Sequence, residues 1–74
     1  MKLRDIIGQS FYVANNKLTK DLKLKTWYEI TKRSTDAQLI VRPVGASKLV
    51  QVPFKAFVDG NKHQYLLFIE DMET

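Results

Sequence analysis

The sequence predicts a small, mainly β protein, either a five-stranded barrel or a strongly bent antiparallel sheet, with a short helix at its N-terminal end. Short runs of aromatic and β-branched residues recur at close spacing, and turn-forming residues separate them. The length of 74 residues allows one domain and excludes two. Many short strands in so small a domain are typical of a barrel or a bent sheet. We therefore expect residues 1–74 to form a single β domain, which ends in an acidic tail at residues 70–74.

The chain begins with a predicted helix followed by a predicted strand. Lys2–Ile7 places its apolar residues on one side of a helix, and Gly8 is a typical C-terminal stop. Ser10–Ala14 is rich in aromatic and branched residues and predicts a strand. Two asparagines then favour a turn, and we expect Lys17–Asp21 to form a polar, basic connection.

The clearest periodicity lies in Leu22–Thr31, where the residues alternate in character. One face of this segment consists of Leu22, Leu24, Thr26, Tyr28 and Ile30. The opposite face consists of Lys23, Lys25, Trp27, Glu29 and Thr31. The alternation predicts a half-buried strand.

Two further strands are predicted in the next part of the chain. The polar stretch Lys32–Asp36 predicts a turn, and Ala37–Val44 predicts a strand with an apolar middle. Pro43 is expected near the end of that strand, because proline cannot donate a hydrogen bond to a neighbouring strand. Gly45 marks a tight connection to the following predicted strand, Lys48–Val52.

Residues 53–58 have two interpretations. Pro53 in the first-turn position, with Phe54 and Phe57 three residues apart, favours a single helical turn. Alternatively, the preceding strand continues, and the Asp-Gly pair at positions 59 and 60 forms a hairpin turn.

The last predicted strand is Lys62–Glu70. Its apolar run Tyr65–Ile69 predicts burial on both faces, either in the centre of the sheet or against another subunit. We therefore single out Tyr65, Leu67 and Ile69 as the candidate strand for a partner or dimer contact.

Five strands joined by turn-length loops, with a helical turn before the last strand, resemble the SH3-like barrel architecture in the order of their elements. The resemblance implies a small barrel. The acidic and aromatic peptide-binding signature of signalling SH3 domains is not evident in this sequence, and an OB-type barrel and an α+β sheet dimer stay open as alternatives.

The charge of the chain is uneven. It carries 12 basic and 8 acidic residues, and three of the acids lie in the last five residues, so residues 1–69 contain 12 bases and 5 acids, a balance of +7. The bases are densest between residues 17 and 33, where they are Lys17, Lys20, Lys23, Lys25, Lys32 and Arg33. Such a basic protein favours polyanionic partners, although surplus lysines also serve solubility alone.

Composition and spacing argue against most other classes of function. No cysteine is present, which excludes disulfides and thiol chemistry and suits a reducing cytoplasm. The longest apolar run has five residues, and charges interrupt the N-terminus, so neither a membrane span nor a signal peptide is expected. The chain has one histidine, His63, no nucleophile motif and no glycine-rich phosphate loop. We expect a cytoplasmic, non-enzymatic protein without catalytic residues, metal or cofactor.

Trp27 is the main candidate for a binding residue. The alternation places its indole on the polar face beside Lys23 and Lys25, where it would stack a nucleobase while the lysines contact phosphates. Tyr12 extends the same surface if it points outward from its strand. A slip of one residue in register would bury the indole in the core instead.

Two functions remain. The first is a binding module for RNA or single-stranded DNA that uses the seven residues Lys17, Lys20, Lys23, Lys25, Trp27, Lys32 and Arg33, with Arg42 and Lys48 flanking a groove. The second is a protein-binding adaptor or inhibitor, similar to small accessory proteins of bacteriophages, that acts through an edge strand or the run Tyr65–Ile69 on a larger protein.

The size of the chain limits the stability of the folded domain. Area scaling predicts a folded surface of about 4,700 Å². So small a core balances chain entropy only narrowly, and no disulfide adds to it. We therefore expect a monomer or a small homo-oligomer.

Overall fold

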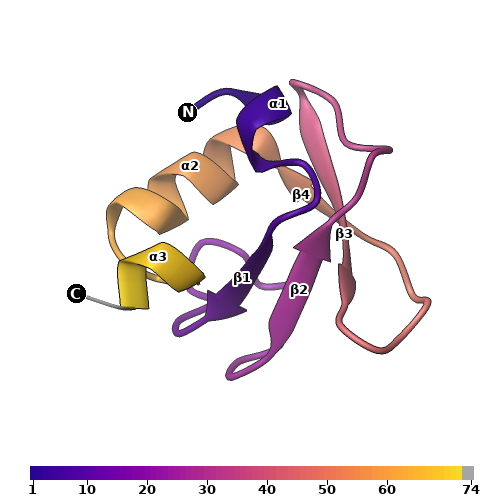
Figure 1. Ribbon diagram of the computed structural model, residues 1–74. Helices are drawn as coiled ribbons and strands as arrows, with labels where there is room; N and C mark the ends of the chain where they lie inside the picture. Colours follow the sequence, from indigo (N-terminus) through magenta and orange to yellow (C-terminus); the bar gives the residue numbers. More distant parts are fainter. Residues whose placement is uncertain (73–74) are drawn as a thin grey trace.

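The computed structural model describes the backbone of residues 1–72 and the side chains of residues 1–70, and it is built around one five-stranded antiparallel sheet (Figure 1). The strands are β1 (Ser10–Val13), β2 (Trp27–Ile30), β3 (Gln38–Pro43), β4 (Val50–Pro53) and β5 (Leu66–Phe68). Their order in the sheet is β4-β3-β2-β1-β5, so β1 to β4 form a meander and β5 pairs with the free edge of β1.

In the described residues, three helices accompany the sheet: α1 (Leu3–Ile6), α2 (Phe54–Lys62) and α3 (Ile69–Met72). The helix α2 connects β4 to β5 and lies on one side of the sheet, where it packs against β3, β4 and β5 (Figure 1). The short α3 follows β5 directly and packs against β5 and β1. Within residues 1–72, no helix combines the length and the apolar character that a membrane crossing requires.

The core lies between the sheet and α2. Phe11 of β1 stacks on Tyr28 of β2 at a centroid distance of 5.9 Å and meets Phe57 of α2 edge-on at 5.0 Å. Leu22, in the loop between β1 and β2, is buried in the same cluster. We call the side of the sheet that faces this cluster the inner face and the opposite side the outer face.

The prediction of a mainly β domain with an N-terminal helix is confirmed, but the sheet does not close into a barrel. The strands β4 and β5 form its two edges, and the segment between them is a nine-residue helix instead of a turn. The surface of 5110 Å² slightly exceeds the area of about 4,700 Å² expected for a chain of this mass.

Most of the locally encoded elements are confirmed. The helix α1 lies within the predicted range, and Gly8 after it has a φ of 88°, the left-handed conformation that favours glycine at such a stop. The strands β1, β3 and β4 also lie at their predicted places. Pro43 is the last residue of β3.

The prediction of a strand over Leu22–Thr31 is wrong in its first half. Only Trp27–Ile30 forms a strand, and the residues before it form turns. Lys25 has a φ of 56°, which breaks the extended conformation, and Leu24 is 52% exposed. The backbone N–H of Lys23 donates to the Tyr28 hydroxyl at 2.9 Å, so the loop folds back over the edge of the core.

The helical interpretation of residues 53–58 is confirmed, and the hairpin alternative is wrong. Pro53 is the residue before α2, which is longer than the single turn expected and runs through positions 59 and 60. Gly60 is buried, and a Cβ on it would lie 3.0 Å from the Leu66 side chain. Glycine is therefore used here for a close approach of helix and strand.

The prediction of a long last strand is also wrong at both ends. Of Lys62–Glu70, only Leu66–Phe68 is a strand, because α2 extends to Lys62 and Gln64 adopts a φ of 64°. The strand β5 lies at an edge and not in the centre of the sheet. Leu66 is fully buried, whereas Ile69 is 54% exposed, so the run is not buried on both faces.

Candidate nucleic-acid interface

Trp27 lies on the outer face of the sheet. Along β2, Tyr28 and Ile30 are buried in the core, whereas Trp27 and Glu29 are half-buried on the other side. The register is therefore the one that the alternation predicts, and the indole is not part of the buried core. The side chains of Trp27 and Glu29 are each half-buried, so part of the outer side of β2 is accessible.

Tyr12 of β1 stands directly opposite Trp27 in the register of the two strands. The two rings lie 5.4 Å apart between centroids, with an angle of 55° between their planes. We call this pair the aromatic platform. Leu67 is the partner of Tyr12 in β5, and Val44, whose N–H donates to the Trp27 carbonyl at 3.0 Å, lies on the other side and is 59% exposed.

Lys25 lies next to the platform, two residues before Trp27 in the loop that enters β2, whereas the backbone of Lys23 lies on the inner side, where its N–H donates to the Tyr28 hydroxyl. Both lysines are exposed. The N–H of Lys25 donates to the Val13 carbonyl at 2.8 Å, which ties this part of the loop to the end of β1. One exposed lysine on a tethered backbone, Lys25, thus stands at one end of the platform.

Lys17 and Lys20 are brought to a different place. They line a hollow of about 280 Å³ that lies between the β1–β2 loop and β4, with Gln51 and Pro53 on its other wall. The loop therefore crosses toward the far edge of the sheet, and these two lysines are separated from the platform by the width of the β4-β3-β2 layer.

Lys32 and Arg33 lie in the turn between β2 and β3, at the opposite end of β2 from Lys25. Together with Arg42 and Ser47 they line a groove of about 540 Å³, which we call the basic groove. Its other lining residues are Gly8, Glu29, Ile30, Thr31 and Leu49.

Arg42 is held in this groove by an ion pair. Its guanidinium contacts the carboxylate of Glu29, its cross-strand partner, at 2.8 Å and 3.0 Å. Glu29 lies on the outer face two residues after Trp27, so an ion-paired acid separates the platform from the turn cations. The pair was not anticipated from the sequence, because it depends on the register between β2 and β3.

No protein-family model, curated protein or solved structure matches the chain. The assignment of a function therefore depends on the geometry of this protein alone.

One backbone carbonyl of the candidate partner strand, that of Leu66, already accepts a hydrogen bond from a side chain. Asn61 in α2 donates its side-chain amide to the Leu66 carbonyl at 2.9 Å. Tyr65 lies opposite the end of β1 and stacks on His63 at 5.5 Å, and Leu67 faces the platform. Ile69 begins α3.

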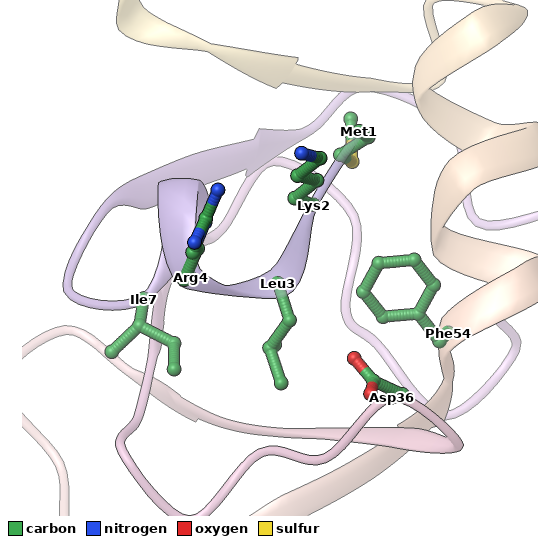
Figure 2. A pocket seen from close by; sticks show the side chains of 7 residues that line it. All are labelled: Met1, Lys2, Leu3, Arg4, Ile7, Asp36 and Phe54. Carbon is green, nitrogen blue, oxygen red and sulfur yellow. The ribbon is translucent and has the colours of Figure 1, made fainter.

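A further hollow of about 440 Å³ lies between α1 and the start of α2 (Figure 2). Leu3 and Phe54 extend into it beside the Asp36 carboxylate, whereas Lys2 and Arg4 direct their charged ends away from Asp36. The described side chains include no group of three His, Asp, Glu or Cys residues that lie close enough together to hold a metal ion.

Proposed function

We propose that the protein binds single-stranded nucleic acid, RNA or DNA, on the outer face of its sheet. Nucleobases stack on the aromatic platform, and Lys25, which is exposed two residues before Trp27, contacts the phosphates next to the stacked bases. The observation that supports this most is the half-buried Trp27 beside Tyr12 on the outer face of the sheet. The two rings are half-buried beside each other, which leaves part of their surface on the outer face available for stacking.

The shape of the site favours unpaired bases. The longest described helix, α2, has nine residues and lies on the inner side, so it is not placed to enter a major groove. Every nucleobase has a π-face, so stacking on Trp27 and Tyr12 tolerates sequence, and the lysines add a salt-sensitive attraction. The cytoplasmic location expected from the sequence is part of this proposal, as is the SH3-like order of elements, here in a sheet that stays open.

Substitution of Trp27 tests the proposal. Stacking contributes about 1–3 kcal/mol per base, so Trp27→Ala should weaken binding of a mixed single-stranded oligonucleotide roughly 5- to 150-fold. Trp27→Phe retains a ring and should lose much less. Fluorescence anisotropy measures the affinity, and circular dichroism shows that each variant is folded.

The salt dependence supplies a second readout in the same experiment. The affinity of the unmodified protein should fall between about 50 and 200 mM salt with a log–log slope of about 0.7 per phosphate contact. Absence of binding at the lower salt, for both RNA and DNA, would overturn the proposal. An oligonucleotide affinity that Trp27→Ala leaves intact would remove the platform from it.

A protein partner is the second candidate, favoured by the apolar residues that extend the platform. Leu67 and Val44 lie on either side of Tyr12 and Trp27, and Val44 is well exposed. An adaptor or inhibitor would dock on this face more readily than it would add a strand at β5, because the Asn61 amide already donates to the Leu66 carbonyl of that strand. Capture of a protein from lysate that survives nuclease treatment and is lost with Val44→Glu would favour this candidate.

A further inference from the structure

The basic groove lies on the same face as the aromatic platform. Side chains of β2 alternate, so Trp27, Glu29 and Thr31 follow one another on the outer side, and both Glu29 and Thr31 line the groove. At about 3.3 Å per residue, Thr31 lies about 13 Å from Trp27 along the strand direction. The groove therefore begins where the platform ends.

The turn that carries Lys32 and Arg33 is fixed in place. Ile40 is the anchor: its carbonyl accepts from the Thr31 N–H at 2.9 Å and from the Thr31 hydroxyl at 2.6 Å. The buried Ser34 hydroxyl lies 3.2 Å from the same carbonyl and accepts from the Ile40 N–H at 2.9 Å. Cations on a fixed turn lose less conformational freedom on binding an anion than cations on a loose loop.

The cations of the basic groove are not equally free to bind an anion. Arg42 is paired with Glu29, whereas Lys32 and Arg33 are exposed and form no ion pair with any described residue. Ser47, from the connection between β3 and β4, adds a hydroxyl to the same groove. Two unpaired cations and a hydroxyl suit a phosphate group.

We propose that the basic groove holds a backbone phosphate of the same strand whose bases stack on the platform. The strand would run along the outer side of β2, from Lys25 past Trp27 and the Glu29–Arg42 pair to Lys32 and Arg33. This inference rests on the proposed function and extends it: it assigns a path to the bound strand, and only a ligand long enough to span the about 13 Å from Trp27 to Thr31 can follow that path. Lys17 and Lys20, at the far edge of the sheet, do not belong to this path.

A length series of oligothymidylates, from about two to about ten nucleotides, tests the path and brackets the shortest known single-strand sites. The double variant Lys32→Ala/Arg33→Ala should bind the shortest oligonucleotides as the unmodified protein does. It should bind the longest ones roughly 5- to 10-fold more weakly, with a salt slope smaller by about 0.7 for each lost contact. The matched control is Lys55→Ala/Lys62→Ala, which removes two exposed charges from α2.

The outcomes separate this inference from the function on which it rests. Trp27-dependent binding with no effect of the double variant at any length would overturn the path and leave the proposed function standing. Equal losses in the double variant and the α2 control would also overturn it, because they would reflect net charge alone. If the addition of a 5′-phosphate to a short oligonucleotide raises its affinity to that of a long oligonucleotide, the groove is a site for a terminal phosphate. The proposed path is then wrong. Binding of no oligonucleotide would refute the function itself.

Discussion

At the residue scale, Glu29 is the feature that sets the charge of the outer face. It is half-buried between the aromatic platform and the turn cations, and it occupies one side of the Arg42 guanidinium. A carboxylate at this position repels a polyanion, and the pair with Arg42 reduces that repulsion without removing it. In the proposed interface, this carboxylate should hold the affinity for a polyanion below what the other residues of the face permit.

Glu29→Gln should strengthen oligonucleotide binding. The substitution removes a negative charge from the proposed path and releases Arg42 toward phosphate, which together should raise the affinity by about 1 kcal/mol, or roughly 5-fold. The salt slope should increase by about 0.7 if Arg42 joins the contact. Asp36→Asn, which makes the same charge change in an exposed turn beside another hollow, is the control. Unchanged or weaker binding by Glu29→Gln would contradict the role assigned to the acid.

At the scale of the elements, the connection between α2 and β5 determines how the last strand reaches its edge. His63 ends the helix, and Gln64 after it adopts a φ of 64°, a conformation that glycine adopts most readily. A left-handed residue with a side chain costs about 1–2 kcal/mol. Here the sequence uses glutamine where the backbone favours glycine.

Gln64→Gly should therefore stabilise the protein. The relief of left-handed strain exceeds the extra flexibility of glycine in the unfolded chain, and the net gain should be about 0.5–1 kcal/mol. Urea unfolding measures it. Lys62→Gly, inside α2 and with helical backbone, should lose about 1 kcal/mol in the same assay. If both glycines destabilise the protein, the left-handed conformation at position 64 is wrong.

The elements also show what the sequence was able to predict. Apolar spacing and stop residues are local signals, and they located α1, β1, β3 and β4. The start of β2 was missed because the alternation continues through Lys25, whose left-handed backbone leaves no trace in the pattern. The length of α2 was missed because an Asp-Gly pair is typical of a turn, whereas here Gly60 packs against Leu66.

The same distinction applies to the candidate site. The outward side of Trp27 followed from alternation alone, and its pairing with Tyr12 was anticipated as an extension of the same surface. The Glu29–Arg42 pair and the position of Val44 required the cross-strand register, which no local pattern encodes. To predict that the lysines are distributed over three places, one would have had to know the path of the β1–β2 loop.

At the scale of the whole molecule, a cluster of aromatic rings joins the sheet to α2. Phe57 contacts Phe11 at 5.0 Å and Phe68 at 5.7 Å between ring centroids, and it is fully buried. A domain of this size has a free energy of unfolding of about 4–11 kcal/mol. One ring in this cluster therefore accounts for a large share of the total.

Phe57→Ala should cost about 3–5 kcal/mol, which is most of the free energy of unfolding if the protein lies at the lower end of that range. Thermal unfolding followed by circular dichroism measures the loss. Phe54→Ala, on the same helix but only half-buried, should cost clearly less. Equal losses at the two positions would show that α2 does not meet the sheet through Phe57.

The hydrogen bond from Asn61 to Leu66 affects how neighbouring copies of the protein meet. Unpaired carbonyl and N–H groups on a terminal strand attract the same groups of another molecule, and repeated pairing produces aggregates. Because the Asn61 amide occupies the Leu66 carbonyl, one point of attachment is closed before a second copy arrives. A concentrated solution of this small, marginally stable protein should accordingly be protected from lateral polymerisation along β5, and loss of the Asn61 side chain should promote it.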